Sequence, residues 1–178
     1  MTSFATSALR CASAAILLAL SACASQVTRP PESADAAREP VRALSSYTVT
    51  MSPQANAQLA DNLKFNIDSL RTKISQALDS KGLVAKDGDF EMQVVVDDIR
   101  VRGTFSAVMF GFMAGDDHLY GTATLRRGDK TLGNFVIKTS WALSGLAGGQ
   151  NDARVGWLYE EFAKQLAEEL VARRDAKR

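Results

Sequence analysis

One cysteine near the amino terminus carries the clearest chemistry in this chain of 178 residues. Cys23 directly follows Leu20-Ser21-Ala22, at the end of an apolar run that occupies residues 12–22. A run of this length fits the hydrophobic region of a secretory signal peptide and falls short of the ~20 residues that a transmembrane helix needs. We therefore predict export, with residues 1–22 as the signal peptide.

The ending Leu20-Ser21-Ala22-Cys23 resembles the lipobox of bacterial lipoproteins, in which small residues precede a cysteine that is acylated before cleavage. The alternative is an ordinary signal peptide that is cut nearby. The resemblance implies that Cys23 is lipidated and that a lipid bilayer is a permanent partner through its acyl chains. Ala24 follows the cysteine in place of an aspartate, which by the same resemblance favours the outer membrane, on its periplasmic side, over the inner membrane.

The charge balance and the cysteine content bear on two further questions: whether the domain binds nucleic acid and whether it contains a disulfide. The chain has 21 Lys and Arg and 20 Asp and Glu, and Arg10 is the one charged residue among residues 1–22, so the rest is formally neutral. A balanced domain of this kind does not favour a nucleic-acid partner, which requires a basic face. Of the two cysteines, Cys11 leaves with the signal peptide, so no disulfide is expected in the remaining chain.

Residues that could perform catalysis or bind a metal are sparse. His118 is the single histidine, and no nucleophile motif accompanies it. Asp97 and Asp98 could form a metal-binding or catalytic pair, but adjacent residues of a strand face opposite sides of the sheet. We therefore expect a protein that is not an enzyme, with no catalytic residues, no cofactor and no metal site.

The segment Gly103–Gly115 is unusually apolar for a connection between two strands. It contains three phenylalanines and two methionines, which are the candidate partner-contact residues Phe105, Met109, Phe110, Phe112 and Met113. One interpretation is that these side chains cover an end of the sheet, because most apolar residues of a small domain belong to its core. The other is a binding loop for a protein or lipid, since Met and Phe form adaptable contact surfaces.

The rest of the chain divides into a spacer and one domain. Three of the four prolines lie between Cys23 and Ala43, which predicts a disordered spacer at residues 23–43 and a single domain at residues 44–178. Alternation predicts a strand over Leu44–Met51. A helix should follow, with Phe65 alone on its polar face, a cap at Gly82 and an apolar stripe made of Leu59, Leu63, Ile67, Leu70, Ile74 and Leu78.

Three further strands and a second helix complete the prediction. Residues 90–102 form a strand whose apolar alternation shifts phase, which indicates a β-bulge near Asp97 or Asp98. Residues 118–126 and 131–143 form a hairpin. We expect a loop of odd length, because it would pair Ala123 with Phe135 and Gly121 with Ile137 and keep the faces consistent. The last helix buries Val155, Leu158, Phe162, Leu166 and Leu170.

This order of elements predicts an α+β domain, in which an antiparallel β-meander sheet carries two amphipathic helices packed on one face. The lipobox, the Pro-rich spacer, the helix ending at Gly82-Leu83, the strands around a Gly-rich apolar segment and the helix with Leu-Ala-Glu-Glu-Leu at 166–170 resemble an uncharacterised family of bacterial envelope lipoproteins, a domain of unknown function. That family is similar in architecture to the amino-terminal domain of the Tol-system translocation protein, to the lipoproteins that activate penicillin-binding proteins and to the curli-secretion lipoprotein.

Two hypotheses about the function remain. In the first, the domain is a non-enzymatic interaction module that binds an unidentified envelope protein. In the second, it is a subunit of an oligomeric secretion or transport assembly, which would make a homo-oligomer.

Overall fold

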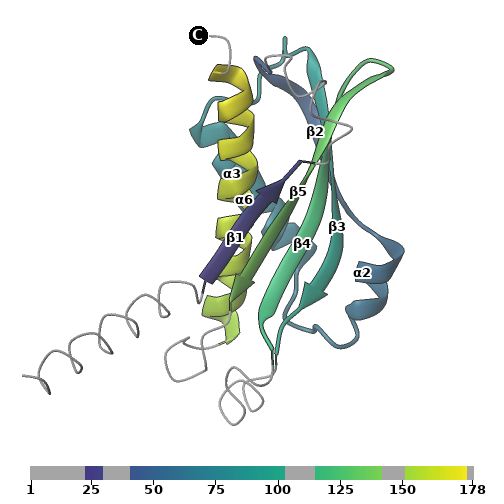
Figure 1. Ribbon diagram of the computed structural model, residues 1–178, viewed down its shortest axis with the longest axis vertical. Coiled ribbons are helices and arrows are strands. Elements are labelled where there is room, and N and C mark those ends of the chain that lie inside the picture. Colours follow the sequence, from purple (N-terminus) through teal and green to yellow (C-terminus); the bar gives the residue numbers. More distant parts are fainter. Residues whose placement is uncertain (1–22, 30–40, 103–114, 142–150, 176–178) are drawn as a thin grey trace, which may run out of the picture.

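The computed structural model describes residues 23–29, 41–102, 115–141 and 151–175 (Figure 1). Five strands form one sheet in the order β1-β5-β4-β3-β2, and three helices accompany it. In chain order the elements are β1 (Cys23–Thr28), β2 (Leu44–Met51), α2 (Pro53–Gln58), α3 (Ile67–Ser80), β3 (Phe90–Arg100), β4 (Asp117–Arg127), β5 (Lys130–Trp141) and α6 (Asn151–Asp175).

The predicted α+β fold is confirmed. The two longer helices, α3 and α6, lie side by side against one face of the sheet (Figure 1). Their apolar stripes meet the inward residues of β3, β4 and β5, and the fully buried side chains there include Leu70, Ile74, Leu78, Phe90, Phe135 and Phe162. Burial of one such side chain contributes about 1.5–3 kcal/mol, so this interface supplies most of the hydrophobic stabilisation.

One strand pair departs from the expected antiparallel meander. The pairs β3–β4, β4–β5 and β5–β1 are antiparallel, whereas β2 pairs parallel with β3. The reason is that α2 and α3 lie between β2 and β3 in the chain. They return the chain to the end of the sheet at which β2 began, so that β3 can run in the same direction, as parallel pairing requires. Gly82 has a φ of +59° and lies just after the end of α3, where the sequence predicted a helix cap.

The single helix predicted between β2 and Gly82 is wrong, because the chain breaks it in two. α2 ends at Gln58 and α3 begins only at Ile67, where the Asn66 side chain accepts a hydrogen bond from the Ser69 N–H and caps the new helix. Two residues of the connection reverse their expected positions. Phe65 is buried edge-on against Tyr159, with ring centroids 5.5 Å apart, while Leu63 is 87% exposed.

The break in the helix is explained by contacts with the edge of β3. Beyond the end of β2, that edge would present unpaired backbone groups. The Gln58 amide oxygen accepts from the Ile99 N–H at 2.9 Å, and the Asn62 amide oxygen accepts from the Val101 N–H at 2.6 Å. The Asn62 amide nitrogen also donates to the Ile99 carbonyl. These two side chains satisfy the edge as a further strand would, which a continuous helix could not do.

Of the predictions for the antiparallel strands, the bulge in β3 and the pairing of the hairpin are confirmed, whereas the loop length is not. The β3–β4 register shifts between Val96 and Asp98, as the predicted bulge requires. The hairpin pairs Ala123 with Phe135 and Gly121 with Ile137, as expected. The predicted odd-length loop is nevertheless wrong: Arg127 pairs with Lys130 across a two-residue turn, and a bulge at Leu132 supplies the extra residue.

Gly121, near the centre of the sheet, lies against helix α6 and leaves no room for a side chain. A Cβ at Gly121 would lie 2.9 Å from Cζ of Phe162 on α6 and 2.8 Å from the Val95 carbonyl oxygen. We expect Gly121→Ala to lower the free energy of unfolding by about 1–3 kcal/mol, because α6 must move off the sheet. Thermal unfolding followed by circular dichroism measures the change.

Gly156, in α6, provides a matched control. Nothing lies within 4 Å of a Cβ built there, so Gly156→Ala should raise the stability through its gain in helix propensity. Equal melting temperatures for the two variants would contradict the close packing of Phe162 on Gly121. Across the described residues, none of the helices has the length and apolarity that crossing a bilayer requires.

Candidate functional site at the Cys23 end of the sheet

The predicted lipidation residue is the first residue of strand β1. Cys23 pairs with Trp141 at the end of β5, and Trp141 also pairs with Asp117 at the start of β4. We call this end of the sheet, along the direction of the strands, the Cys23 end. The other end, at the Gly128-Asp129 turn, is the hairpin end. The prediction of a disordered spacer is therefore wrong for Cys23–Thr28, while residues 30–40 lie outside the described residues.

Polar contacts fasten β1 to helix α6. Ser25 Oγ donates to Glu161 Oε1 at 2.7 Å, and Gln165 Nε2 donates to both of those oxygens. After the strand ends, the Arg29 guanidinium makes two hydrogen bonds with the buried Glu169 carboxylate, at 2.9 and 2.5 Å. Ionised, two-pronged bonds of this kind are among the stronger polar contacts in proteins.

Glu169 has a second arginine partner on its own helix. Arg173 Nε donates to Glu169 Oε1 at 2.9 Å, and its guanidinium lies over the Phe135 ring, 5.0 Å from the ring centre. From their charge alone both residues would be expected in solvent, but they are buried. The spacing of Glu169 from Phe162 and Leu166 is the signal that places it on the buried face of α6.

The contacts with β1 change the pKa of Glu161. Burial alone would raise this pKa, but the hydrogen bonds from Ser25 and Gln165, together with the Lys164 charge, outweigh burial and lower it. On Arg29, the hydrogen bonds to Glu169 raise the pKa further above its ordinary value despite partial burial. The hydrogen bonds from Ser25 and Gln165 therefore favour the ionised form of Glu161.

This lowered pKa predicts how the docking of β1 depends on pH. A depressed carboxyl pKa contributes stability that is complete above the unfolded value, about 4.5, and is lost as the pH falls through the folded value. We expect the amide protection of Ser25–Thr28, measured by hydrogen exchange and corrected for intrinsic rates, to fall as the pH drops from 4.5 through the lowered pKa of Glu161. Glu161→Gln should weaken the pH dependence, with the Arg29–Glu169 pair still present, whereas Glu160→Gln, on the exposed side of α6, should leave it unchanged. The same pH dependence in both variants would contradict the role of Glu161.

A buried cluster of three charged residues, Arg102, Asp117 and Arg154, lies at the Cys23 end of the sheet. Asp117 is fully buried, and Oδ1 accepts from the backbone N–H and the Nε of Arg102, at 2.7 and 3.1 Å. Its other oxygen, Oδ2, lies 3.2 Å from Nε of Arg154, in the first turn of α6. The Arg102 guanidinium also donates to the carbonyls of Gly115 and Trp141, and Arg154 donates to the Arg102 carbonyl.

This cluster joins β3, β4, β5 and α6 at one point, and it is absent from the predictions made from the sequence. The signal that could have found it is the alternation of β4, which places Asp117 on the same inward face as Leu119 and Gly121. An inward acid must have a partner, because an isolated buried charge is strongly disfavoured. Trp141 and Trp157 pack edge to face beside the cluster, with ring centroids 4.9 Å apart.

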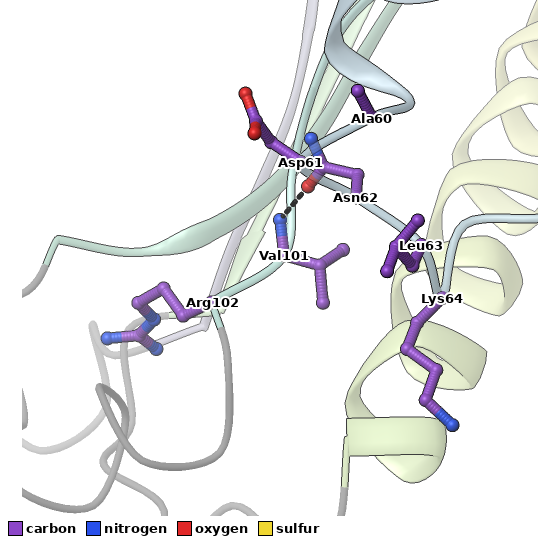
Figure 2. A pocket seen from close by; sticks show the side chains of 7 residues that line it. All are labelled: Ala60, Asp61, Asn62, Leu63, Lys64, Val101 and Arg102. Carbon is purple, nitrogen blue, oxygen red and sulfur yellow. Dashed lines mark hydrogen bonds between the residues drawn. The ribbon is translucent and has the colours of Figure 1, made fainter.

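An open hollow of 270 Å³ lies at the same end, under the connection between α2 and α3. Ala60, Asp61, Asn62, Leu63, Lys64, Val101 and Arg102 line it. Figure 2 shows Asn62 turned towards the Val101 N–H, with Leu63 and Lys64 following along the connection. Lys64 Nζ lies 3.2 Å from the Asp152 carboxylate, which ties this connection to the first turn of α6.

His118 and the two predicted acids lie on the other face of the sheet. Nε2 of His118 is 3.3 Å from Asp98, Nδ1 is 3.4 Å from Asp116, and the ring stacks on Tyr120 with centroids 4.5 Å apart. Burial first, then Asp116 and Asp98, raises the pKa of Tyr120. Asp97 does not join Asp98, because it accepts from the Thr122 hydroxyl at 2.6 Å. Within the described ranges, no three His, Cys, Asp or Glu side chains are grouped as metal ligands.

The predicted partner-contact residues Phe105, Met109, Phe110, Phe112 and Met113 lie outside the described residues. The flanking residues are described, and both are at the Cys23 end: Arg102 and Gly115 are joined there by the hydrogen bond from the Arg102 guanidinium.

Comparison with protein families identifies the domain. A family model described as a domain of unknown function, DUF4410, matches residues 28–145. The chain belongs to the DUF4410 family. The matched range includes β2, β3, β4 and β5, whereas Cys23 and helix α6 fall outside the DUF4410 match. The predicted family with a domain of unknown function is thus confirmed at this level, and the architectural likenesses to the Tol-system and penicillin-binding-protein lipoproteins stay predictions.

The chain also has low similarity to several solved structures. A PelC dodecamer from Paraburkholderia phytofirmans is 10% identical, with a TM-score of 0.47 over 83% of this chain and 96% of that one. A variant of the same protein is 12% identical with a TM-score of 0.46. Protein XCC0632 from Xanthomonas campestris, of family DUF330, is 15% identical, with a TM-score of 0.46 over 82% and 88% of the two chains. With TM-scores below 0.5 we base no argument on these similarities. No protein of curated function matches the chain.

Proposed function

We propose that this chain is a lipoprotein of the bacterial envelope, anchored in the outer membrane through acylated Cys23, whose domain works by binding another envelope protein. The observation that carries the proposal is the position of Cys23, which ends the Leu20-Ser21-Ala22-Cys23 motif and begins the first strand of the folded sheet. The motif supports an acylated amino terminus, and the strand joins that terminus to the domain without a spacer.

Support for binding rather than catalysis comes from the sheet face turned away from α3 and α6, which we call the open face. β4 contributes His118, Tyr120, Thr122 and Thr124 to it, and β5 contributes Lys138. On this face both His118 nitrogens lie beside carboxylates, and Lys138 lies over the Tyr120 ring at 5.5 Å. A face that combines an aromatic ring with charges of both signs suits a protein contact.

A second candidate function, a subunit of an oligomeric secretion or transport assembly, rests on the same open face. Neither long helix covers this face, so a second copy of the chain could bind there as readily as another protein. The two PelC structures are dodecamers of that protein, and the assembly of this chain needs its own experiment.

One crosslinking experiment tests both candidates. A photoreactive residue replaces Lys138 on the open face, in the full-length lipoprotein in its native envelope. The matched control replaces Lys164, an exposed lysine on α6. A discrete adduct with a different envelope protein, from position 138 and not from 164, supports the interaction module. An adduct of twice the mass that contains this chain alone supports the assembly. Equal yields at the two positions would contradict both.

A further inference from the structure

We propose that the Cys23 end of the sheet rests directly on the bilayer surface, with the Leu63 side chain inserted at the boundary between headgroups and acyl chains. This inference rests on the proposed acylation of Cys23 and adds an orientation and a second contact with lipid. The occupant of this surface is the bilayer in which the acyl chains lie.

The first support is the short distance between the anchor and the fixed part of the fold. Cys23 is two residues from Ser25, whose hydroxyl bonds with Glu161 of α6. Two extended residues span at most about 7 Å. A lipid attached at Cys23 therefore cannot hold the domain at a distance, as a flexible spacer would, and the end of the sheet must lie at the membrane surface.

The second support is the exposure of Leu63 at this end. Its neighbours have structural contacts, since Asn62 bonds with β3 and Phe65 packs on Tyr159, whereas Leu63 is 87% exposed. Leucine is among the residues that enter a bilayer most favourably. The adjacent Lys64 is exposed, and a long basic side chain can keep its charge among the headgroups while its methylene groups follow the leucine.

The third support is the contrast between the two ends of the molecule. The hairpin end exposes Arg126, Arg127, Asp129 and Lys130 around its turn. At the Cys23 end, Arg102 and Arg154 are instead buried against Asp117 and the two tryptophans pack against each other, while Arg100, Lys64 and Asp152 stay exposed. The apolar side chain that the described part of this end offers to lipid is therefore Leu63, and the exposed charges around it suit the headgroup layer.

Fluorescence quenching in vesicles tests the orientation. Leu63→Cys carries an environment-sensitive NBD dye, and Asp129→Cys at the hairpin end carries the same dye as the matched control. The lipidated full-length protein is reconstituted into phosphatidylethanolamine–phosphatidylglycerol vesicles that contain doxyl-labelled phosphatidylcholine. Acylation blocks the Cys23 thiol against the dye. Insertion at the headgroup–acyl boundary should quench the dye at position 63 by at least about twofold more than at position 129.

The other outcomes separate this inference from the proposed function. Equal quenching at the two positions, with the protein still bound to vesicles, would overturn the orientation and leave the anchor intact. A blue-shifted dye at position 63 without lipid quenching would show that another part of the chain covers Leu63, and would also overturn it. Failure of the protein to sediment with vesicles at all would instead overturn the anchoring. Because Leu63 is exposed, the labelled variant should keep the melting temperature of the unlabelled protein.

Discussion

Replacing Cys23 by serine should abolish acylation and leave the chain uncut, as a precursor that is larger by residues 1–22. The hydroxyl of serine cannot form the thioether that bears the lipid, and the resemblance to a lipobox implies that cleavage follows acylation. The effect is all-or-none. Labelling of cells with an alkyne fatty acid measures acylation, and the mobility of the chain on a denaturing gel measures cleavage.

A second form of the experiment isolates the anchor from the signal peptide. When an ordinary cleavable signal replaces residues 1–22 of the Cys23→Ser variant, the domain should appear in the soluble periplasmic fraction. Each buried methylene of an acyl chain contributes ~0.8 kcal/mol to membrane binding, so loss of the chains removes the attachment. Cys11→Ser, within the natural signal peptide, is the matched control and should change neither acylation nor cleavage. Fatty-acid labelling that persists in Cys23→Ser would refute the proposed lipidation site.

Asp117→Asn should be the most destabilising single change in the folded domain. The substitution removes the buried carboxylate that lies between the guanidinium groups of Arg102 and Arg154, and so takes a counter-charge away from both. Loss of one partner from a buried ionic cluster typically costs about 3–5 kcal/mol. For a domain of this size we expect the melting temperature to fall by about 10 °C. Thermal unfolding of the lipoprotein in detergent, followed by circular dichroism, measures the shift.

Asp129→Asn is the matched control for charge. Asp129 is exposed in the two-residue turn of the hairpin, so the same chemical change should alter the stability by less than about 0.5 kcal/mol. If Asp117→Asn melted within a degree or two of Asp129→Asn, the ion cluster would not be what holds the strand ends and α6 together.

The elements that could be predicted from the sequence are those governed by local periodicity. The strand Leu44–Met51 and the core face of α6 follow from alternation and from the helical spacing of apolar residues, and both are observed. The pairing of Ala123 with Phe135 also follows, because a register that mixed the two faces would expose the core. The two-residue turn differs from the prediction because a bulge can supply the same shift as a longer loop.

The break between α2 and α3 could not be predicted in this way. Leu63 fits the helical spacing, and spacing carries no information about contacts with distant residues. Gln58 and Asn62 bond with a strand edge about 40 residues further along the chain, and those bonds outweigh the helix. The same limit applies to the candidate site. Cys23 is found by a local motif, whereas Asp117, Arg102 and Arg154 meet only once the fold is formed.

The pairing of β1 with β5 also sets the order in which the protein is completed. Ser25 pairs with Thr139 and bonds with Glu161, so the first strand of the described chain finds its partners only among the last elements. Closing so long a loop comes late in folding, because its entropic cost must be met before the contacts form. Under the proposed lipidation, the enzyme that acylates Cys23 would therefore meet an extended chain rather than the edge of a finished sheet. In that proposed sequence of events, closure of β1 on the sheet is the step that would convert an acylated amino terminus into a fixed orientation of the domain.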